Sequence, residues 1–445
     1  MKRRGLAIFL ALSLALSLCA CVRVKTEEDR VDDVVQQGDF TFTMQPDGTY
    51  SVKPTDWKSL PTEIIIPDNC NGIAVTGIGY HAFSGCESLV SVTLPNSIKT
   101  IEDGAFYSCS ALKSITIPEG VTSIGGCAFT YCESLERISL PNSLTSIGMG
   151  VFSNSNAFVG TTYEKAIYLG NAENPYLYLW KATDTNMETI SIHPSVSFID
   201  HEAFDIVTAL IGTTYKNAVY LGNEQNPHLY LWKAVDTDIN EVSIHPSAKL
   251  IGCYAFSDCK YITEIIIPVG IAFVGDLALS SCAKLKSITV EEGNPMYYSE
   301  GNCLIKKENK SLIAGCKSSK IPNDVTSISD HAFRGCTSLT RITIPNSVKR
   351  IGDSAFGHCS SLVSIRIPDS VVRIDSGAFA FCTNLTSVMI PESVMSIGIW
   401  AFDDCDRLAA VYYMGTADDW KNLKYDSKDL DFENATVYYC ADTNR

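Results

Sequence analysis

The chain has 445 residues, with 50 Asp or Glu against 35 Lys or Arg, so its formal net charge at pH 7 is −15. This acidic balance argues against a nucleic-acid partner and against electrostatic binding to anionic lipid. The length alone suggests two or three domains, but a repeated pattern that runs through most of the chain overrides that expectation.

The first residues have the features of a lipoprotein export signal. Lys2-Arg3-Arg4 precede an uncharged apolar run that ends in Leu18-Cys19-Ala20-Cys21. This order is typical of a secretory signal, here residues 1–20, with Cys21 as the lipid-anchored new N-terminus. We therefore expect an exported protein, lipid-anchored to the outer face of a bacterial cell envelope. An ordinary cleaved signal or an uncleaved anchor is the alternative.

Two segments separate this signal from the repeats. Residues 21–38 contain many acidic and Gln residues and little to bury, which predicts a flexible tether. Residues 39–60 are expected to form an N-terminal cap, a hairpin with Thr41 and Phe42 opposite Thr49-Tyr50-Ser51. A cap is needed because the first repeat of a stack would otherwise leave one face bare.

A phenylalanine then returns at nearly fixed spacing, with steps of 23 residues interrupted by steps of 52, 52 and 54. An aliphatic residue lies five positions before it, and in most units a cysteine lies three positions after it. An alternating run closed by proline follows, which predicts a short strand with one buried face. The Ala-Phe-x-x-Cys segment suits one turn of α- or 3₁₀-helix. The period is carried by Phe83, Phe106, Phe129, Phe152, Phe204, Phe256, Leu279, Phe333, Phe356, Phe379 and Phe402.

The pattern I-G-x-x-A-F-x-x-C-x-x-L-x-x-I-x-I-P, nearly intact from Ile351 to Pro368, resembles the BspA-like leucine-rich repeats of bacterial surface proteins. The resemblance covers about residues 62–440. It implies a β-dominated solenoid of the leucine-rich-repeat type over residues 61–410, with units of about 23 residues. Relatives in that family include adhesins that engage host extracellular-matrix proteins, so the resemblance favours binding over catalysis.

The long steps of the period predict inserted β-hairpins near residues 157–192, 209–244 and 291–320, because turn-forming Gly-Asn and Asn-Pro pairs separate apolar runs there. The first two insertions are near-copies of each other. After residue 410 the period breaks, and residues 411–445 are expected to form the C-terminal cap.

The insertions and the outward strand positions supply the candidate ligand-binding residues. Amphipathic rings gather in the first two insertions, as they do at many binding surfaces, although packing within each hairpin is the favoured explanation. On the outward strand face, short hydroxyls need no ligand to explain them, but two arginines one repeat apart suggest an anionic contact. The candidates are Tyr176, Tyr178, Trp180, Tyr230, Trp232, Arg341 and Arg366.

The chain has 17 cysteines, and nine occupy the same repeat position. In a stack they would form a ladder of buried free thiols, which pack as small apolar residues. Vertical or accessory disulfides are the alternative, involving Cys253, Cys303, Cys316 or Cys440. A metal site is disfavoured, because a regular ladder offers no tetrahedral cage.

The motif search finds no nucleophile elbow, zinc-protease motif, phosphate loop or calcium loop. His193 and His245 recur in Ser-Ile-His-Pro-Ser but stand where other units have a loop. We therefore expect no enzyme activity, no cofactor and no metal. The sequence favours a surface adhesion or interaction module for a host or neighbouring-cell protein or glycan, attached to the membrane through its lipid only. A passive envelope spacer without a ligand is the alternative.

Overall fold

The structure, a computed structural model, describes residues 34–45, 47–423 and 434–440. The expected signal peptide and Cys21 lie outside these residues. Among the described residues, none forms a helix long and apolar enough to cross a bilayer. The chain is a β-dominated solenoid of stacked short repeats, which confirms the predicted fold class.

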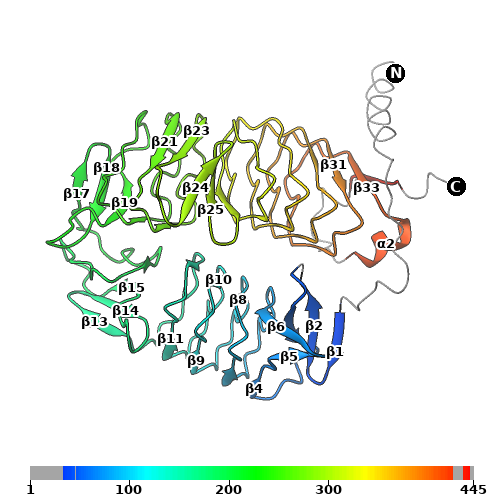
Figure 1. Ribbon diagram of the computed structural model, residues 1–445, viewed down its shortest axis with the longest axis horizontal. Helices are drawn as coiled ribbons and strands as arrows, with labels where there is room; N and C mark the ends of the chain where they lie inside the picture. Colours follow the sequence, from blue (N-terminus) through cyan, green and yellow to red (C-terminus); the bar gives the residue numbers. More distant parts are fainter. Residues whose placement is uncertain (1–33, 46, 424–433, 441–445) are drawn as a thin grey trace.

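The solenoid turns back on itself, so that two arms lie side by side (Figure 1). We call residues 34–158 the first arm, residues 159–244 the bend and residues 245–440 the second arm. The two 52-residue steps of the sequence period fall in the bend. The fold therefore brings repeats from opposite ends of the chain next to each other.

The N-terminal cap is a meander of three antiparallel strands, β1 (Val34–Gln37), β2 (Phe40–Met44) and β3 (Tyr50–Pro54). The prediction of a tether is wrong for residues 34–37, which pair with β2. The predicted hairpin register is also wrong, because Phe42 lies opposite Val52. Strand β3 then pairs in parallel with the first repeat, so the meander joins the solenoid sheet directly.

Most regular repeats contribute two short strands, one on the side that faces the other arm and one on the opposite side. The first kind, which we call groove strands, are β6 (Ile73–Ile78), β8 (Thr100–Ile101), β10 (Ser123–Ile124), β12 (Ser146–Ile147), β20 (Leu250–Ile251), β22 (Phe273–Val274), β27 (Ser327–Ile328), β28 (Arg350–Ile351), β30 (Arg373–Ile374) and β32 (Ser396–Ile397).

The second kind, the outer strands, are β4 (Glu63–Ile65), β7 (Ser91–Thr93), β9 (Ser114–Thr116), β11 (Arg137–Ser139), β21 (Glu264–Ile267), β23 (Ser287–Val290), β29 (Ser364–Arg366), β31 (Ser387–Ile390), β33 (Ala410–Tyr413) and β34 (Thr436–Tyr439). Neighbouring strands of each kind pair in parallel and in register, as Ile101 with Ile124 and Ile124 with Ile147. Because of this register, each apolar residue of a repeat stacks on the equivalent residue of the next repeat.

The inserted segments contain antiparallel strands, as predicted. They are β13 (Thr161–Tyr163), β14 (Ala166–Leu169), β15 (Tyr178–Ala182), β17 (Thr213–Tyr215), β18 (Ala218–Leu221), β19 (Tyr230–Ala234), β24 (Tyr297–Glu300), β25 (Cys303–Lys306) and β26 (Ser311–Ala314). Outside the insertions, β5 (Asn69–Cys70) pairs with β6. Within them, the last strand pairs in parallel with the groove-side strand of the next repeat, as β15 does with β16 (Phe198–Ile199). The last strand of each insertion thus takes the place of a groove strand.

The turn around the periodic phenylalanines differs from the predicted helical turn. Except at Phe204, the residues two before and two after the ring adopt left-handed backbone, as Cys127 (φ 52°) and Tyr131 (φ 59°) do around Phe129. The N–H of Phe129 donates to the carbonyl of Val151 in the next repeat at 2.9 Å. Because these amides bond between repeats, they cannot make the bonds of a helix.

The core of each arm is a column of stacked rings braced by thiols. Successive phenylalanines lie nearly parallel, with ring centres 5.2 Å apart for Phe83 and Phe106 and for Phe356 and Phe379. The Cys382 thiol donates to the Phe356 carbonyl at 3.2 Å, and the same bond recurs in other repeats. Ser155, which replaces cysteine, donates to the Phe129 carbonyl at 2.6 Å. The cysteine position therefore favours a small donor, although Val207 occupies it in the repeat of Phe204.

The ladder thiols from Cys86 to Cys382 are buried, and no disulfide joins them. The accessory cysteines Cys253, Cys303 and Cys316 are also free thiols, while Cys440 is half-buried near the C-terminal cap. This arrangement matches the expectation of a thiol ladder. Burial raises the pKa of the Cys86 thiol to about 11, so the ladder is a set of neutral donors.

The second arm closes with the short helix α2 (Ala417–Asn422) between β33 and β34. Thr416 and Asp419 form a capping box at the start of this helix. Strand β34 extends the outer sheet, and Trp420 packs edge-on against Tyr413, with ring centres 5.1 Å apart. The end of the stack is thereby covered.

Candidate functional site: the groove between the arms

The groove strands of the two arms border a groove of about 2940 Å³. Hydroxyl side chains from both arms line it, and so do Lys53, Lys99 and Lys349. The hydroxyl residues include Thr100, Ser123, Ser146, Ser327, Ser393 and Ser396. Such a wall offers hydrogen-bond donors and acceptors over the length of several repeats, which suits an extended polar ligand.

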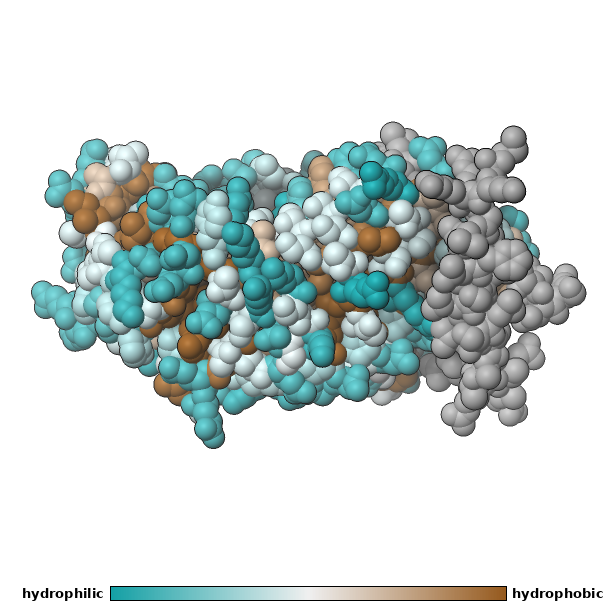
Figure 2. Space-filling view, turned by 90° about the horizontal axis from the view of Figure 1, so that it is seen from above, coloured by the Kyte–Doolittle hydropathy of each residue, from teal (hydrophilic) through white to brown (hydrophobic). Residues whose placement is uncertain are grey.

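The outward strand face that the sequence favoured lies elsewhere. Its strands, β9, β31 and their neighbours, run along the outer sides of the two arms, away from the groove (Figure 1). Figure 2 views the outer side of the second arm, where hydrophobic residues lie in separate areas among hydrophilic ones. Arg341 and Arg366 are exposed but do not line the groove, and the anionic contact proposed for them stays a prediction.

The aromatic residues of the insertions are mostly core. Tyr178, Trp180 and Tyr230 are only 2%, 6% and 4% exposed, so their prediction as ligand-binding residues is wrong in this folded form. The Tyr178 hydroxyl donates to Asp200 at 2.5 Å. The reason is geometric. The last strand of each insertion pairs in parallel with the next repeat and joins the solenoid sheet, so its aromatic side chains face the core.

Tyr176 and Trp232 are half-buried, and neither lines the groove. Tyr176 stacks on His193 with ring centres 3.8 Å apart, and its equivalent in the second copy, His228, stacks on His245 at 3.9 Å. Each of the two histidines that recur in Ser-Ile-His-Pro-Ser also hydrogen-bonds a nearby serine through Nδ1. These contacts give both histidines a packing role.

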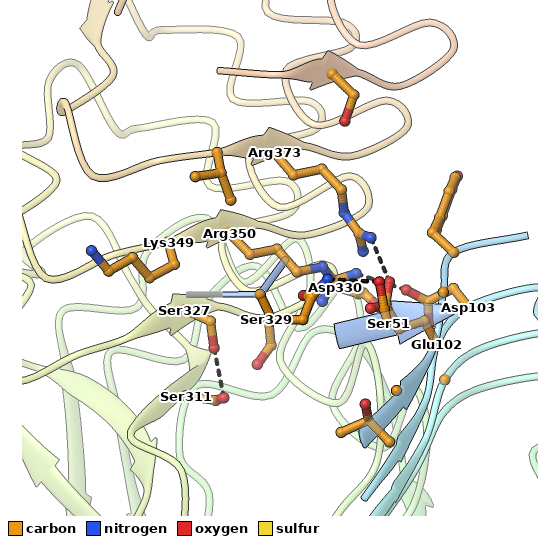
Figure 3. Close-up of a pocket in the computed structure, with 18 of the residues that line it drawn as sticks. Ser51, Glu102, Asp103, Ser311, Ser327, Ser329, Asp330, Lys349, Arg350 and Arg373 are labelled. Carbon is orange, nitrogen blue, oxygen red and sulfur yellow. Dashed lines mark hydrogen bonds and ion pairs between the residues drawn. The ribbon is translucent and has the colours of Figure 1, made fainter. Parts of the chain in front are cut away.

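A charged cluster crosses the groove where the arms meet. Figure 3 shows Arg350 and Arg373 of the second arm directed toward Glu102 and Asp103 of the first arm. Arg350 Nη2 lies 2.7 Å from Asp103 Oδ2 and 3.0 Å from Asp330 Oδ1, and Nε contacts Asp375. Arg373 pairs with Glu102 of the first arm and, at 2.5 Å, with Asp375. Asp375 is 1% exposed. We call these six side chains, together with Asp353, the inter-arm cluster.

Burial and crowding shift the pKa values of the cluster. Burial, with the charge of Asp330, raises the pKa of Asp103 to about 7. Burial, with the charges of Asp330 and Asp375, raises the pKa of Asp353 to about 9. Burial opposes ionisation of Asp330 as well, but Arg350 beside it lowers its pKa. Asp103 and Asp353 therefore hold protons at a pH where an ordinary carboxyl is ionised.

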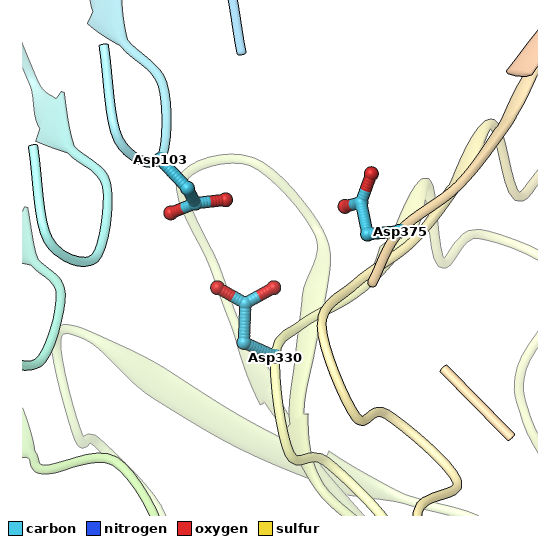
Figure 4. A group of neighbouring side chains, drawn as sticks. All are labelled: Asp103, Asp330 and Asp375. Carbon is cyan, nitrogen blue, oxygen red and sulfur yellow. The ribbon is translucent and has the colours of Figure 1, made fainter. Parts of the chain in front are cut away.

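Three of these carboxyl groups converge as metal ligands do. Asp103, Asp330 and Asp375 each offer an oxygen, and these oxygens lie within 4.8 Å of one another (Figure 4). The Arg350 guanidinium, however, contacts all three residues. An arginine thus supplies the positive charge that a cation would bring, so this set serves an ion-pair network.

The aspartates of the cluster also brace the stack, which explains why they recur. Asp103 accepts the N–H of Gly126 at 2.6 Å, and Asp330 accepts that of Asp353 at 2.8 Å, in each case from the equivalent position one repeat later. The sequence carried a signal for these residues, since an acid stands three or four positions before several of the periodic phenylalanines. No sequence pattern indicated that the solenoid turns back at the bend and brings these aspartates opposite the arginines of the other arm.

Comparison with known families gives one match. The family described as "BspA type Leucine rich repeat region (6 copies)" matches residues 58–171, 234–309 and 310–428. No protein of curated function matches the chain.

Solved structures of bacterial leucine-rich repeat proteins also match the chain. They include a leucine-rich cell surface protein from Faecalibacterium prausnitzii, 24% identical, with 88% of this chain and 98% of that chain covered and a TM-score of 0.35. A leucine-rich repeat protein from Bacteroides ovatus is 23% identical, with 91% and 99% covered and a TM-score of 0.32. The pneumococcal vaccine antigen PcpA is 17% identical, with 92% and 98% covered and a TM-score of 0.30.

Proposed function

Because this chain belongs to the BspA type leucine-rich repeat family, we propose that it is a non-catalytic interaction protein of the bacterial cell surface. Its ligand is an extended polar partner, a protein segment or glycan of a host or neighbouring cell. The ligand lies in the groove between the arms. Cys21 carries the lipid that holds the protein to the membrane.

One observation carries the proposal, namely that both arms line a single groove of about 2940 Å³ with hydroxyl groups. Hydroxyls of Ser and Thr donate and accept, so they complement backbone amides and sugar hydroxyls equally well. A groove built from repeats presents the same pattern several times, which favours a partner that is itself extended or repetitive.

Several charged groups in the groove are engaged with other residues of the protein. Lys306 is 3% exposed, and its Nζ donates to the Thr145 carbonyl at 2.9 Å and lies 3.4 Å from Glu308. The arginines of the inter-arm cluster contact carboxyl groups. These ion pairs and hydrogen bonds give Lys306, Arg350 and Arg373 a structural role, which accords with a binding function.

The decisive experiment places a bulky side chain in the groove and compares its effect with that of the same side chain on the outer side of the first arm. Ser123→Trp places a bulky side chain in β10, which lines the groove, and Ser114→Trp places the same side chain in β9 on the outer side. Purified variants would be applied to arrays of glycans and matrix proteins and to intact cells. The proposal expects binding that Ser123→Trp abolishes and Ser114→Trp retains. Binding lost only with Ser114→Trp, or no binding in any assay, would contradict it.

The anchor is tested separately. Cells expressing the full chain would be fed an alkyne-tagged fatty acid, and the label on the chain would be measured after fractionation. We expect label and membrane association in the original sequence and loss of both in Cys21→Ala. Label that persists in the variant would refute lipidation at Cys21, whatever the groove binds.

A further inference from the structure

Contacts between the two arms join residues that a simple solenoid keeps apart, since each repeat of a solenoid normally touches only its neighbours. The bend itself also touches the second arm, where the rings of Phe198 and Phe273 meet edge-on with centres 5.3 Å apart. Farther out, Lys306 reaches Thr145. At the inter-arm cluster, Arg350 and Arg373 meet Asp103 and Glu102. Beyond it, Tyr80 and Ser376 share a hydrogen bond of 2.6 Å.

A further contact between the arms fills a gap in the repeat pattern. In other repeats, an aspartate three positions before the phenylalanine accepts an N–H from the next repeat. Gly126 occupies that position in the first arm and has no side chain to accept the N–H of Met149. Asp276 of the second arm accepts this N–H instead, at 2.8 Å. The hydrogen-bond pattern of the first arm is therefore complete only when the second arm lies against it.

The inter-arm contact is charged, whereas the core of each arm is apolar. The cluster contains five carboxyl groups and two guanidinium groups, so its formal charge is −3 if every group ionises. Like charges held this closely repel one another. The closed arrangement therefore depends on some carboxyl groups keeping their protons.

Titration of the cluster, and of Asp276 beside it, has a definite direction. The pKa values of Asp103 and Asp276 are about 7 and that of Asp353 is about 9, in each case raised chiefly by burial. If the arms separate, water reaches these groups and their pKa values fall toward about 4. The closed form thus binds more protons, so closure is favoured at low pH and weakened as the pH rises through about 7 to about 9.

The other titratable groups that face the cluster do not reverse this direction. On the first arm these are Tyr80, His81 and Cys127, on the second arm His331, and beside Asp276 His201 and Cys253. Burial lowers the pKa of His81 and His331, so these two are neutral throughout the interval. The pKa values of His201 and Cys253 are raised in the closed form, which is the same direction as for the carboxyl groups. Burial raises the pKa of Tyr80 and of Cys127, so neither supplies a proton there.

We propose that the inter-arm cluster is a reversible clasp, which holds the two arms together in acidic to neutral solution and releases them in mildly alkaline solution. Arg350 and Arg373 bridge the arms while the cluster is partly protonated, and repulsion among the carboxylates separates the arms when it is not. The clasp sets the width of the groove. It does not depend on what the groove binds.

Small-angle X-ray scattering of the purified full chain between pH 6 and pH 10 tests the clasp, with far-UV circular dichroism recorded on the same samples. We expect the radius of gyration to rise reversibly between about pH 7 and about pH 9 while the dichroism stays unchanged. A constant radius of gyration, or a rise that accompanies loss of dichroism, would overturn the proposal, because the first means no opening and the second means unfolding.

Two variants with opposite expected effects sharpen the test. Asp103→Asn removes a charge but keeps a similar shape, so the midpoint of opening should shift upward by about one pH unit or more. Arg373→Gln removes a bridge to Glu102 and should shift it downward. Arg366→Gln is the matched control, because Arg366 is exposed on the outer side, and its midpoint should equal that of the original chain. Equal midpoints in Asp103→Asn and Arg366→Gln would also overturn the proposal.

Discussion

The interior of each arm and the contact between the arms are built from opposite kinds of residue. Inside an arm, Phe356 stacks on Phe379 and neutral thiols donate to carbonyls one repeat away, so every contact is apolar or uncharged and repeats every 23 residues. Between the arms, Arg350 meets Asp103 across 247 positions of the chain, and charge decides the contact. The interior is thus insensitive to pH and salt, while the contact between arms responds to both.

The largest expected effect tests the interior. Phe356→Ala removes a fully buried ring from the middle of the column and should reduce the free energy of unfolding by about 3–5 kcal/mol, because the rigid stack cannot collapse into the cavity. Chemical denaturation measures it. Phe381→Ala is the control, since Phe381 is 39% exposed and stacks only on His358. Equal losses in the two variants would contradict a core held by the ring column.

The next effect tests the contact between the arms. Arg350→Gln leaves Asp103, Asp330 and Asp375 without their shared partner and should cost about 1–3 kcal/mol at pH 6, where the clasp holds the arms together. The loss should be smaller at pH 9, because the arms are already separated there and Arg350 no longer reaches Asp103. Denaturant unfolding at both pH values measures the difference. A loss that is the same at both, as expected for Phe356→Ala, would show that the contact is not electrostatic.

A smaller effect separates hydrogen bonding from packing in the thiol ladder. Cys382→Ala leaves the Phe356 carbonyl without its donor and should cost about 1 kcal/mol or somewhat more. Cys382→Ser keeps a donor, as Ser155 does in its own repeat, and should cost less. Thermal unfolding of both variants checks the order. If serine proves worse than alanine, the ladder position selects sulfur for its apolar character.

The smallest effect lies in the bend. Tyr176→His converts the first copy to the residue that the second copy carries as His228, and both stack on an equivalent histidine. The free energy of unfolding should change by less than about 0.5 kcal/mol, as for most half-buried substitutions away from the core. Denaturant unfolding would show it. A change above about 1 kcal/mol would mean that the two copies are not interchangeable.

The sequence predicted the stack because a solenoid is held by local contacts, and local contacts leave a period. The phenylalanine step, the aliphatic residue before it and the proline-ended strand were enough to predict the repeats, the insertions and the buried thiols. The turn around Phe129 was misjudged, since spacing alone does not distinguish a helical turn from one whose amides bond to the next repeat. Tyr178 and Trp180 were misjudged because alternation within the insertion does not say which face the stack covers.

The tertiary structure alone decided where the groove lies. Arg350 and Asp103 each look like an exposed strand or loop residue in its own repeat, and only the turn-back at the bend makes them partners. The same turn-back places hydroxyls such as Ser123 in a shared wall and leaves Arg341 and Arg366 on the outer side. The physical reason is that curvature accumulates from small differences between repeats, so no single residue encodes which distant repeats finally meet.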